Sequence, residues 1–350
     1  MTSSPAWRVA RVDRTCVRLV AADPETGAPR TGPAAGPVVR LRPGGVLDAV
    51  VGEPVAPAVG DAVVPAPTDA DPDRFLLAPR RSELVRDSVD RTAGTQVLAA
   101  NVDVVLVVEH LDPEPKLGRI ERLVTLAWRS GATPVVVLTK ADLVTDAPQW
   151  LDDVARVAPG VGAHAVSAAR GEGLDAVRAV LEPGTTLVVV GPSGAGKSTL
   201  VNALAGGDVM ATGQRRESDG RGRHTTTHRE LVPAGECWLI DTPGLRAVGL
   251  VADADAVDET FPEVAELAAQ CRFGDCAHAG EPGCAIAAAI EDGRLDERRL
   301  ASWRTQQREV AHQARRAGDR AAQLDFRRSV RQRERDIRTY HRVTGRGGRP

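Results

Sequence analysis

The alternation of apolar and polar positions changes character twice along the chain. Up to about residue 90, short apolar runs alternate with turns rich in proline and glycine, a pattern typical of a small β-barrel or sandwich. The predicted strands are Val9–Val12, Val17–Val20, Val38–Leu41, Leu47–Val51, Asp61–Val64 and Phe75–Ala78. Apart from the last of these strands, residues 66–91 are predicted to form a linker.

From about residue 93 the apolar runs become continuous and alternate with segments of helical spacing. A continuous apolar run indicates a strand that is buried on both faces of a sheet. The predicted strands span residues 103–108, 134–138, 164–167 and 185–190, and the predicted helices span 120–129, 151–157, 174–181 and 198–205. Strands that alternate with helices in this way predict βαβ units and a parallel sheet.

From about residue 252 the strand patterns stop. Helical patterns cover residues 295–310 and 315–340, and we expect residues 346–350 to be disordered. Together the three patterns predict an α/β protein with domains at residues 1–90, 91–250 and 251–350.

The composition favours a folded protein of the cytoplasm. Hydrophobic residues make up 42% of the chain, whereas aromatic residues make up only 3%, which argues against base stacking as the main activity. Five cysteines do not suit a secreted disulfide scaffold. The first residues lack a signal-peptide core, and the longest apolar runs are too short to span a bilayer. We therefore expect a cytoplasmic monomer with no membrane partner.

The arginine residues are unevenly distributed. The net charge is −2, yet residues 298–350 contain 16 Arg and no Lys against 5 acidic residues, a local charge of +11. This segment suggests a polyanionic partner such as nucleic acid, with a solvated helical face as the alternative. The whole chain has only three lysines, at positions 116, 140 and 197, and the last two lie in the motifs described next.

A phosphate-binding pattern follows the predicted strand at 185–190. Residues 191–198 match G-x-x-x-x-G-K-[ST] and precede a helical segment, as this motif requires. Its glycines would let backbone N–H groups surround phosphate oxygens at a helix N-terminus. Lys197 would reach the β- and γ-phosphates, and Ser198 would hold Mg²⁺. The predicted phosphate-binding residues are Gly191, Pro192, Ser193, Gly194, Ala195, Gly196, Lys197, Ser198 and Thr199.

An acidic residue ends a further apolar run. Asp241 follows the apolar residues 237–240 and begins the sequence Asp-Thr-Pro-Gly. A carboxylate at the end of a parallel strand lies at the ligand-binding edge of the sheet. Asp241 would hold Mg²⁺, directly or through water, and the N–H of Gly244 would contact the γ-phosphate.

Two earlier loops have the residues of a guanine-binding site. The residues Thr139, Lys140, Ala141 and Asp142 resemble the motif Asn-Lys-x-Asp of GTPases, with threonine in place of asparagine. Asp142 would accept hydrogen bonds from N1–H and the 2-amino group of guanine, and adenine offers no such pair of donors. Ser167 and Ala168 open a second loop that resembles the remaining base-contacting loop, where a backbone N–H would bond the guanine O6.

The order of these motifs is rearranged. In an ordinary GTPase the phosphate loop comes first, whereas here both base-reading loops precede it. Every motif is a loop after a strand at one sheet edge, so joining the chain differently need not move the motifs in space. The sequence therefore predicts a circularly permuted GTPase domain.

The segment between the phosphate loop and Asp241 is predicted to act as a switch. Residues 224–227 read His-Thr-Thr-Thr, and we expect Thr226 to complete the Mg²⁺ shell, with Thr225 and Thr227 as alternatives. Many GTPases place a glutamine directly after Asp-x-x-Gly to orient the attacking water, but position 245 is a leucine. His224 is the candidate for this catalytic role, with a solvated loop histidine as the alternative.

A cysteine cluster follows at residues 271–284. Three thiols and one imidazole at this spacing form a closed tetrahedral set, which predicts one structural Zn²⁺. The predicted ligands are Cys271, Cys276, His278 and Cys284. Cys16 and Cys237 lie in predicted strands and are expected to be small buried residues.

Together these residues resemble the RsgA (YjeQ/EngC) family of small ribosomal subunit biogenesis GTPases. The resemblance covers about residues 80–345 and rests on the base-reading loops, the phosphate loop, Gly222–Thr227, Asp241 and the cysteine cluster. It implies that residues 1–90 form an OB-fold-like barrel and that residues 251–350 form a zinc-binding helical domain. It also implies binding to the 30S subunit late in maturation, GTP hydrolysis that the ribosome stimulates, and release upon hydrolysis.

Two other hypotheses remain open on the residues alone. One is a nucleotide-switched RNA-binding scaffold with negligible turnover, which the missing glutamine favours. The other is a permuted GTPase that acts on the large subunit or elsewhere, against which the cysteine cluster and the N-terminal β domain argue.

Overall fold

The computed structural model describes residues 7–30, 36–66, 74–87, 95–210, 229–241, 254–274 and 276–311. One predicted helix, at 315–340, lies outside the described residues. So do six residues singled out in the sequence, namely His224, Thr225, Thr226, Thr227, Gly244 and Leu245. Within the described part, no helix is both long and apolar enough to cross a membrane.

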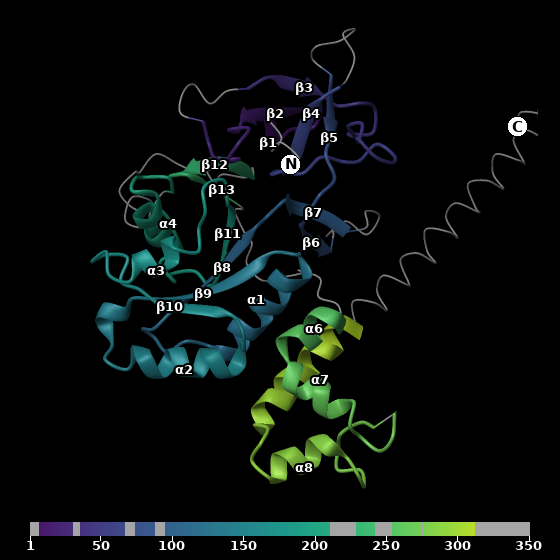
Figure 1. The fold of residues 1–350 in the computed structure, drawn as a ribbon, viewed down its shortest axis with the longest axis vertical. Helices are drawn as coiled ribbons and strands as arrows, with labels where there is room; N and C mark the ends of the chain where they lie inside the picture. The colour runs from purple at the N-terminus through teal and green to yellow at the C-terminus, as the bar shows by residue number, and fades with distance from the viewer. Residues whose placement is uncertain are drawn as a thin grey trace, which may run out of the picture.

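The N-terminal part is a five-stranded antiparallel sheet, half of a barrel (Figure 1). Its order is β3-β2-β1-β4-β5, and a core that includes Val9, Leu19 and Val63 fills its inner face. The strands are β1 (Trp7–Val12), β2 (Cys16–Ala21), β3 (Val38–Arg40), β4 (Ala62–Pro65) and β5 (Phe75–Leu77). The strand expected at 47–51 is wrong, because Leu47 and Ala49 form only isolated bridges between turns at Gly45 and Gly52.

A hairpin begins in the predicted linker and ends beyond it. β6 (Glu83–Asp87) and β7 (Thr95–Ala100) pair in antiparallel fashion on the two sides of residue 90. The prediction missed β6 because this strand is short and rich in charge, with the sequence ELVRD. The domain boundary near residue 90 stays a prediction.

The central sheet has six strands in the order β10-β9-β8-β11-β13-β12. All neighbouring pairs are parallel except β12 with β13. The bounds are β8 (Val104–His110), β9 (Thr133–Thr139), β10 (Gly162–Ala165), β11 (Thr186–Val190), β12 (Glu230–Ala234) and β13 (Cys237–Asp241). The expected parallel sheet therefore has one antiparallel edge strand, because the two-residue turn between β12 and β13 permits only a hairpin.

Helices cover both faces of this sheet (Figure 1). Alternate residues of one strand face opposite layers, since Val105 and Val107 join the core under α1 and α2, whereas Leu106 and Val108 join the core under α3 and α4. This double burial explains the continuous apolar runs of the strands. The helices are α1 (Leu117–Arg129), α2 (Ala147–Val157), α3 (Leu174–Arg178) and α4 (Lys197–Ala205), with a short 3-10 helix at Ala141–Leu143.

The C-terminal part is a helical module that lies beyond α1 (Figure 1). Its own core is built around Val257, Phe261, Ile286 and Leu300. The module contains α6 (Ala254–Thr260), α7 (Pro262–Ala268), α8 (Ala285–Glu291) and a helix over residues 297–311.

Buried polar contacts join this helical module to α1 and α2. Glu121 of α1 is fully buried and accepts a hydrogen bond from the guanidinium of Arg299 at 2.8 Å. The same guanidinium donates to the carbonyl oxygen of Val157 at the end of α2, at 2.7 Å. Thr125 of α1 also donates to the hydroxyl of Thr260 at 2.8 Å. We call these contacts the α1 joint.

The N-terminal sheet packs against the amino ends of the central strands. Arg8 of β1 is buried, and it donates to the hydroxyl of Thr186 at the start of β11, at 2.6 Å. Burial lowers the pKa of Arg8 to about 10, so the guanidinium remains charged at neutral pH. The indole N–H of Trp238 donates to the carbonyl oxygen of Gly27 at 2.8 Å. This sheet therefore lies at the opposite edge from the loops that follow the strands.

Candidate nucleotide and metal sites

The loops predicted to bind nucleotide follow strands at one edge of the central sheet. β9 ends at Thr139, β10 at Ala165, β11 at Val190 and β13 at Asp241, and these four strands run parallel. The parallel order brings together motifs that are about 100 residues apart in sequence.

The phosphate loop follows β11 with the backbone that its glycines permit. Gly191 has φ 144°, and a Cβ placed there would lie 2.0 Å from the carbonyl oxygen of Val108. Gly194 and Gly196 also have positive φ, and Gly196 is the N-cap residue of α4. The ammonium of Lys197 donates to the carbonyl oxygens of Gly191 and Pro192 at 3.0 and 2.6 Å, across the mouth of the loop.

The remaining phosphate-loop residues differ in exposure. Ser193 and Thr199 are exposed, Ser198 is half-buried in the first turn of α4, and Ala195 is fully buried. The loop therefore presents polar side chains outward while Ala195 anchors it in the core under α4.

Thr139 joins the first base-reading loop to the phosphate loop. Its side chain is buried, and its hydroxyl donates to the carbonyl oxygen of Ala195 at 2.7 Å. Lys140 adopts a left-handed backbone with φ 62°, which turns the chain sharply after β9. The N–H of Ala141 donates to the carbonyl oxygen of Val166 at 3.1 Å and so joins the two base-reading loops.

Asp142 lies beside the second base-reading loop. A hydrogen bond from the Ser167 side chain is the main cause that lowers the pKa of the Asp142 carboxyl below its usual range. The guanidinium of Arg170, 3.7 Å away, acts in the same direction. Asp142 is therefore a carboxylate at neutral pH, the form that accepts hydrogen bonds.

The second base-reading loop is a compact turn. The N–H of Ser167 donates to the carbonyl oxygen of Glu172 at 3.0 Å, and Gly173 turns the chain into α3. A Cβ at Gly173 would lie 2.5 Å from the carbonyl oxygen of Ala165, so this turn requires glycine. Ala168 stays half-buried beside it.

Sequence reasoning missed a polar cluster at the end of β8. This strand lies between β9, which precedes the first base-reading loop, and β11, which precedes the phosphate loop. Glu109 is only 1% exposed, and its carboxylate accepts hydrogen bonds from Arg119 of α1 at 2.7 and 2.9 Å. The ammonium of Lys140 donates to the carbonyl oxygen of Asp112 in the adjoining loop at 2.9 Å. The signal in the sequence was an acidic residue at the end of an apolar run, the same signal that identified Asp241.

The residues expected to hold Mg²⁺ are described in part. Ser198 and Asp241 are half-buried at the same sheet edge, and hydroxyl and carboxylate oxygens suit this hard cation. Thr226, and the switch residue His224, lie outside the described residues.

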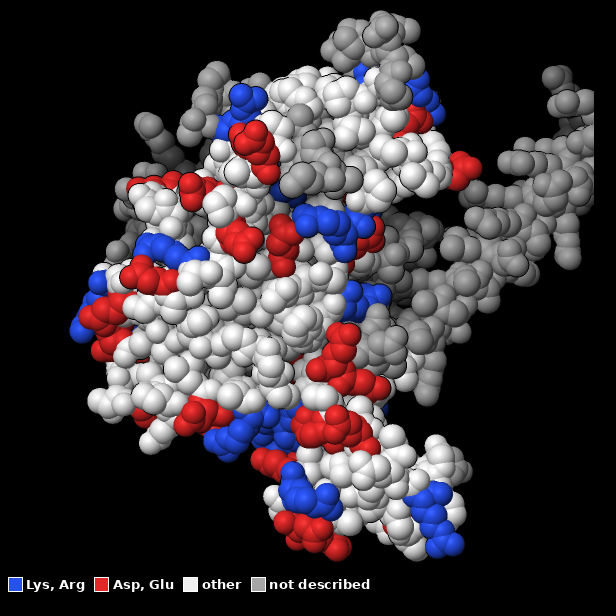
Figure 2. All heavy atoms as spheres, in the orientation of Figure 1, with Lys and Arg blue, Asp and Glu red and all other residues white. Residues whose placement is uncertain are grey.

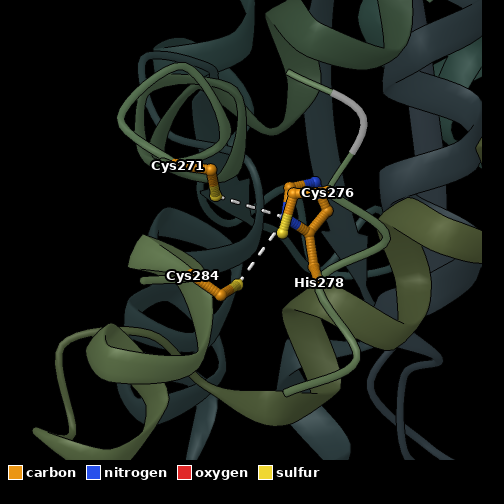
Figure 3. Close-up of side chains that lie close together, drawn as sticks. All are labelled: Cys271, Cys276, His278 and Cys284. Atoms are coloured by element: carbon orange, nitrogen blue, oxygen red, sulfur yellow. Dashed lines mark hydrogen bonds between the residues drawn. The ribbon is translucent and has the colours of Figure 1, made fainter. Parts of the chain in front are cut away.

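The cysteine cluster forms a knuckle, residues 271–284, in the helical module (Figure 3). The ligand atoms of Cys271, Cys276, His278 and Cys284 all lie within 4.8 Å of one another. The Nδ1 atom of His278 lies 3.5 Å from the Cys271 sulfur and 3.8 Å from the Cys284 sulfur. Tetrahedral zinc with bonds of about 2.0 to 2.3 Å holds its ligand atoms roughly 3.5 Å apart, so the four residues fit this ion.

Neighbouring backbone groups act on one thiol of the knuckle. Burial alone would raise the pKa of the Cys271 thiol, but hydrogen bonds from the backbone N–H groups of Ala285 and Ile286 lower it below its usual value. The ring of Trp303 packs edge-on against His278, with ring centres 5.8 Å apart. The knuckle is thus held against the helix at 297–311.

The sheet, its helices and the permuted order of the loops define a circularly permuted GTPase fold. Two solved structures share it. YjeQ from Thermotoga maritima aligns with a TM-score of 0.60 and 22% identity over 87% of this chain and 98% of its own. YloQ, a circularly permuted GTPase, aligns with a TM-score of 0.58 and 20% identity over 89% of this chain and 96% of its own.

Sequence comparison gives the family. Residues 77–251 match the model of the RsgA GTPase family. A protein of Streptomyces avermitilis, named small ribosomal subunit biogenesis GTPase RsgA, is 51% identical over 282 residues, which are 77% of this chain and 75% of that protein. Its namesake RsgA 2 of Listeria monocytogenes is 43% identical over 260 residues, 74% of each chain. The chain belongs to the RsgA GTPase family.

Proposed function

We propose that this protein hydrolyses GTP while bound to the small (30S) ribosomal subunit and assists the late maturation of that subunit. The single observation that carries the proposal is that four parallel strands with GTPase motif residues at or directly after their carboxyl ends finish at one edge of a permuted sheet. The names of the relatives supply the small subunit as the partner. In this proposal the ribosome stimulates hydrolysis, and hydrolysis accompanies release.

In the proposed nucleotide site, different loops bind the phosphates and the base. Backbone N–H groups of residues 191–199 and the ammonium of Lys197 hold the phosphates. The Asp142 carboxylate reads N1–H and the 2-amino group of guanine, while the N–H at Ala168 bonds O6. The hydrogen bond from Thr139 to Ala195 keeps the base-reading loop and the phosphate loop in one arrangement.

The proposed catalytic centre uses a metal ion and a switch residue. Mg²⁺, held by Ser198, Asp241 and Thr226, would neutralise charge that develops on the phosphates. His224 orients the attacking water, because Leu245 has no polar group for that purpose. The N–H of Gly244 contacts the γ-phosphate.

The zinc ion of the knuckle is proposed to be structural. Three thiolates and one imidazole complete a tetrahedral set and leave no position for water or substrate. In this proposal the arginine-rich residues 298–350 contact the phosphate backbone of ribosomal RNA, and the protein acts in the cytoplasm as a monomer.

The decisive experiment is GTP hydrolysis by the purified protein, alone, with small subunits and with large subunits. Strong stimulation by small subunits only is the expected result. The Lys197→Ala variant serves as the control for contaminating activity. Tight GTP binding without stimulation would favour a nucleotide-switched RNA-binding scaffold, and stimulation by large subunits would identify a different assembly reaction.

Guanine reading predicts a change of base preference. Replacing the Asp142 carboxylate by an amide in Asp142→Asn removes an acceptor and adds a donor, which suits the 2-oxo group of xanthine. The variant should bind xanthosine diphosphate more tightly than guanosine diphosphate, as measured by competition with a fluorescent nucleotide. Retained preference for guanosine diphosphate would mean that another group reads the base.

A further inference from the structure

Phe273 is the one aromatic residue that is exposed among those the structure describes. Its side chain is 46% exposed, whereas every other described aromatic residue is buried or half-buried. It does not belong to the core of the helical module, which Phe261 and Ile286 help to form. Its exposed ring can therefore contact a partner without disturbing that core.

The chain around Phe273 is held on both sides. The zinc ligands Cys271 and Cys276 flank it in sequence. The N–H of Arg272 donates to the carbonyl oxygen of Gly283 at 3.1 Å, and the N–H of Cys276 donates to that of Phe273 at 3.3 Å. A ring whose backbone is hydrogen-bonded in this way loses little conformational entropy when it binds a partner.

Arg272 supplies a positive charge directly beside this ring. Its guanidinium lies over the ring of Phe273, 5.4 Å from the centroid. A Cβ at Gly283 would lie 3.0 Å from the Cβ of Arg272, so glycine at that position leaves room for the arginine stem. An exposed ring and an exposed guanidinium are therefore held as a pair.

Charged side chains of both signs border the knuckle. Arg304 donates to the carbonyl oxygens of His278 and Ala277 at 2.6 and 3.3 Å, which places a second guanidinium next to the knuckle. The carboxylate of Glu281 instead accepts the N–H groups of Ala277 and Ala279, at 3.0 and 2.7 Å. On the face drawn in Figure 2, acidic and basic side chains of the described residues are interspersed.

We infer that Phe273 and Arg272 form a stacking site for an unpaired RNA base, with the guanidinium also available to a phosphate. An aromatic face beside a cation suits single-stranded RNA, because the bases of a duplex are already stacked. The inference rests on the proposed function, since the ribosomal subunit would supply the RNA. It adds which feature of that RNA the knuckle recognises.

The test uses the zinc-loaded full chain and a single-stranded RNA of about ten nucleotides that contains one 2-aminopurine. Stacking on Phe273 should quench the 2-aminopurine fluorescence. Phe273→Ala and Phe273→Leu should lose this quenching and weaken binding about ten-fold, whereas Phe273→Trp should retain both. Val180→Ala, which alters another exposed apolar side chain outside both candidate sites, is the matched control and should change neither.

Each variant is also titrated with small subunits in the hydrolysis assay after its zinc content has been measured. Phe273→Ala is expected to raise the subunit concentration needed for half-maximal stimulation. If the wild type is stimulated but Phe273→Ala binds the RNA as well as the wild type does, the stacking site is wrong and the proposed function stands. If Phe273→Ala needs more subunit for half-maximal stimulation but binds the RNA as tightly as the wild type, the ring contacts a ribosomal protein instead, which also overturns the inference. An unstimulated wild type would count against the proposed function itself.

Discussion

At the scale of single residues, the space around each glycine of the phosphate loop determines whether a larger residue could stand there. Gly191 and Gly194 both have positive φ, but only Gly191 faces a backbone atom at the position of a Cβ. A side chain at Gly194 would meet no atom within 4 Å. The G-x-x-x-x-G-K-[ST] pattern requires Gly191 for this contact with Val108, whereas Gly194 lies at a position that the pattern leaves free.

This difference predicts unequal effects of the same substitution. Gly191→Ala should lower the free energy of unfolding by more than about 4 kcal/mol, because β8 and β11 must separate to admit the methyl group. Gly194→Ala should lower it by about 1 kcal/mol, the cost of left-handed backbone alone. Urea titration followed by circular dichroism measures both, and equal losses would refute the steric argument.

Thr139 stands where the motif Asn-Lys-x-Asp has asparagine, and its side chain still links two loops. The hydroxyl reaches Ala195 of the phosphate loop. Thr139→Val keeps the shape of the side chain and removes this hydrogen bond, which is worth about 1 kcal/mol. We expect the Kd for GDP to rise about five-fold with no loss of fold, as measured by fluorescent nucleotide titration. An unchanged Kd would mean that the two loops hold their arrangement without Thr139.

At the scale of elements, α1 contacts both the central sheet and the helical module. Its buried face covers the central sheet, and its fully buried Glu121 accepts hydrogen bonds from two arginines of the helical module. A buried carboxylate needs such partners, because an uncompensated charge away from water is costly. The α1 joint therefore fixes the helical module to α1 and to the end of α2.

The two arginines predict a graded response at the α1 joint. Arg299→Met should lower the free energy of unfolding by about 3 kcal/mol or more, because it leaves Glu121 without its buried partner. Arg298→Met should cost less than about 1 kcal/mol, because the Arg298 side chain is 40% exposed and its ion pair is solvated. Urea titration followed by tryptophan fluorescence compares the two, and equal costs would contradict a buried ionic joint.

At the scale of the whole molecule, the GTPase sheet lies between two attachments at different places. The N-terminal sheet contacts the amino ends of the strands through Arg8, and the helical module contacts α1 through Arg299. Neither attachment contacts the described nucleotide loops at the opposite ends of the strands. The helical module has an apolar core of its own, whereas Val20 and Ala22 of the N-terminal part join the core under α1 and α2.

The separate core of the helical module predicts that zinc removal acts locally. A chelator should release one zinc per chain and increase hydrogen exchange across residues 271–284, because the knuckle has little apolar core of its own. The affinity for GDP should remain unchanged, since α4 and the base-reading loops belong to other cores. A parallel loss of nucleotide binding would show that the α1 joint transmits the damage to the nucleotide site.

The sequence by itself determined the buried parallel strands, the permuted order of the loops and the set of three cysteines and one histidine that meet in the knuckle. These features are local, because apolar periodicity and motif spacing act within a few residues. The sequence did not predict β6, β7 or β12, three short segments that become strands only when a neighbour pairs with them.

Only the tertiary structure decided which distant side chains meet. The pairs Thr139 with Ala195, Glu109 with Arg119, and Glu121 with Arg299 span 56, 10 and 178 positions. No pattern along the chain encodes the first or the last, because packing of separate elements sets those distances. The same packing left Phe273 exposed while it buried Phe261, although the two residues are chemically identical.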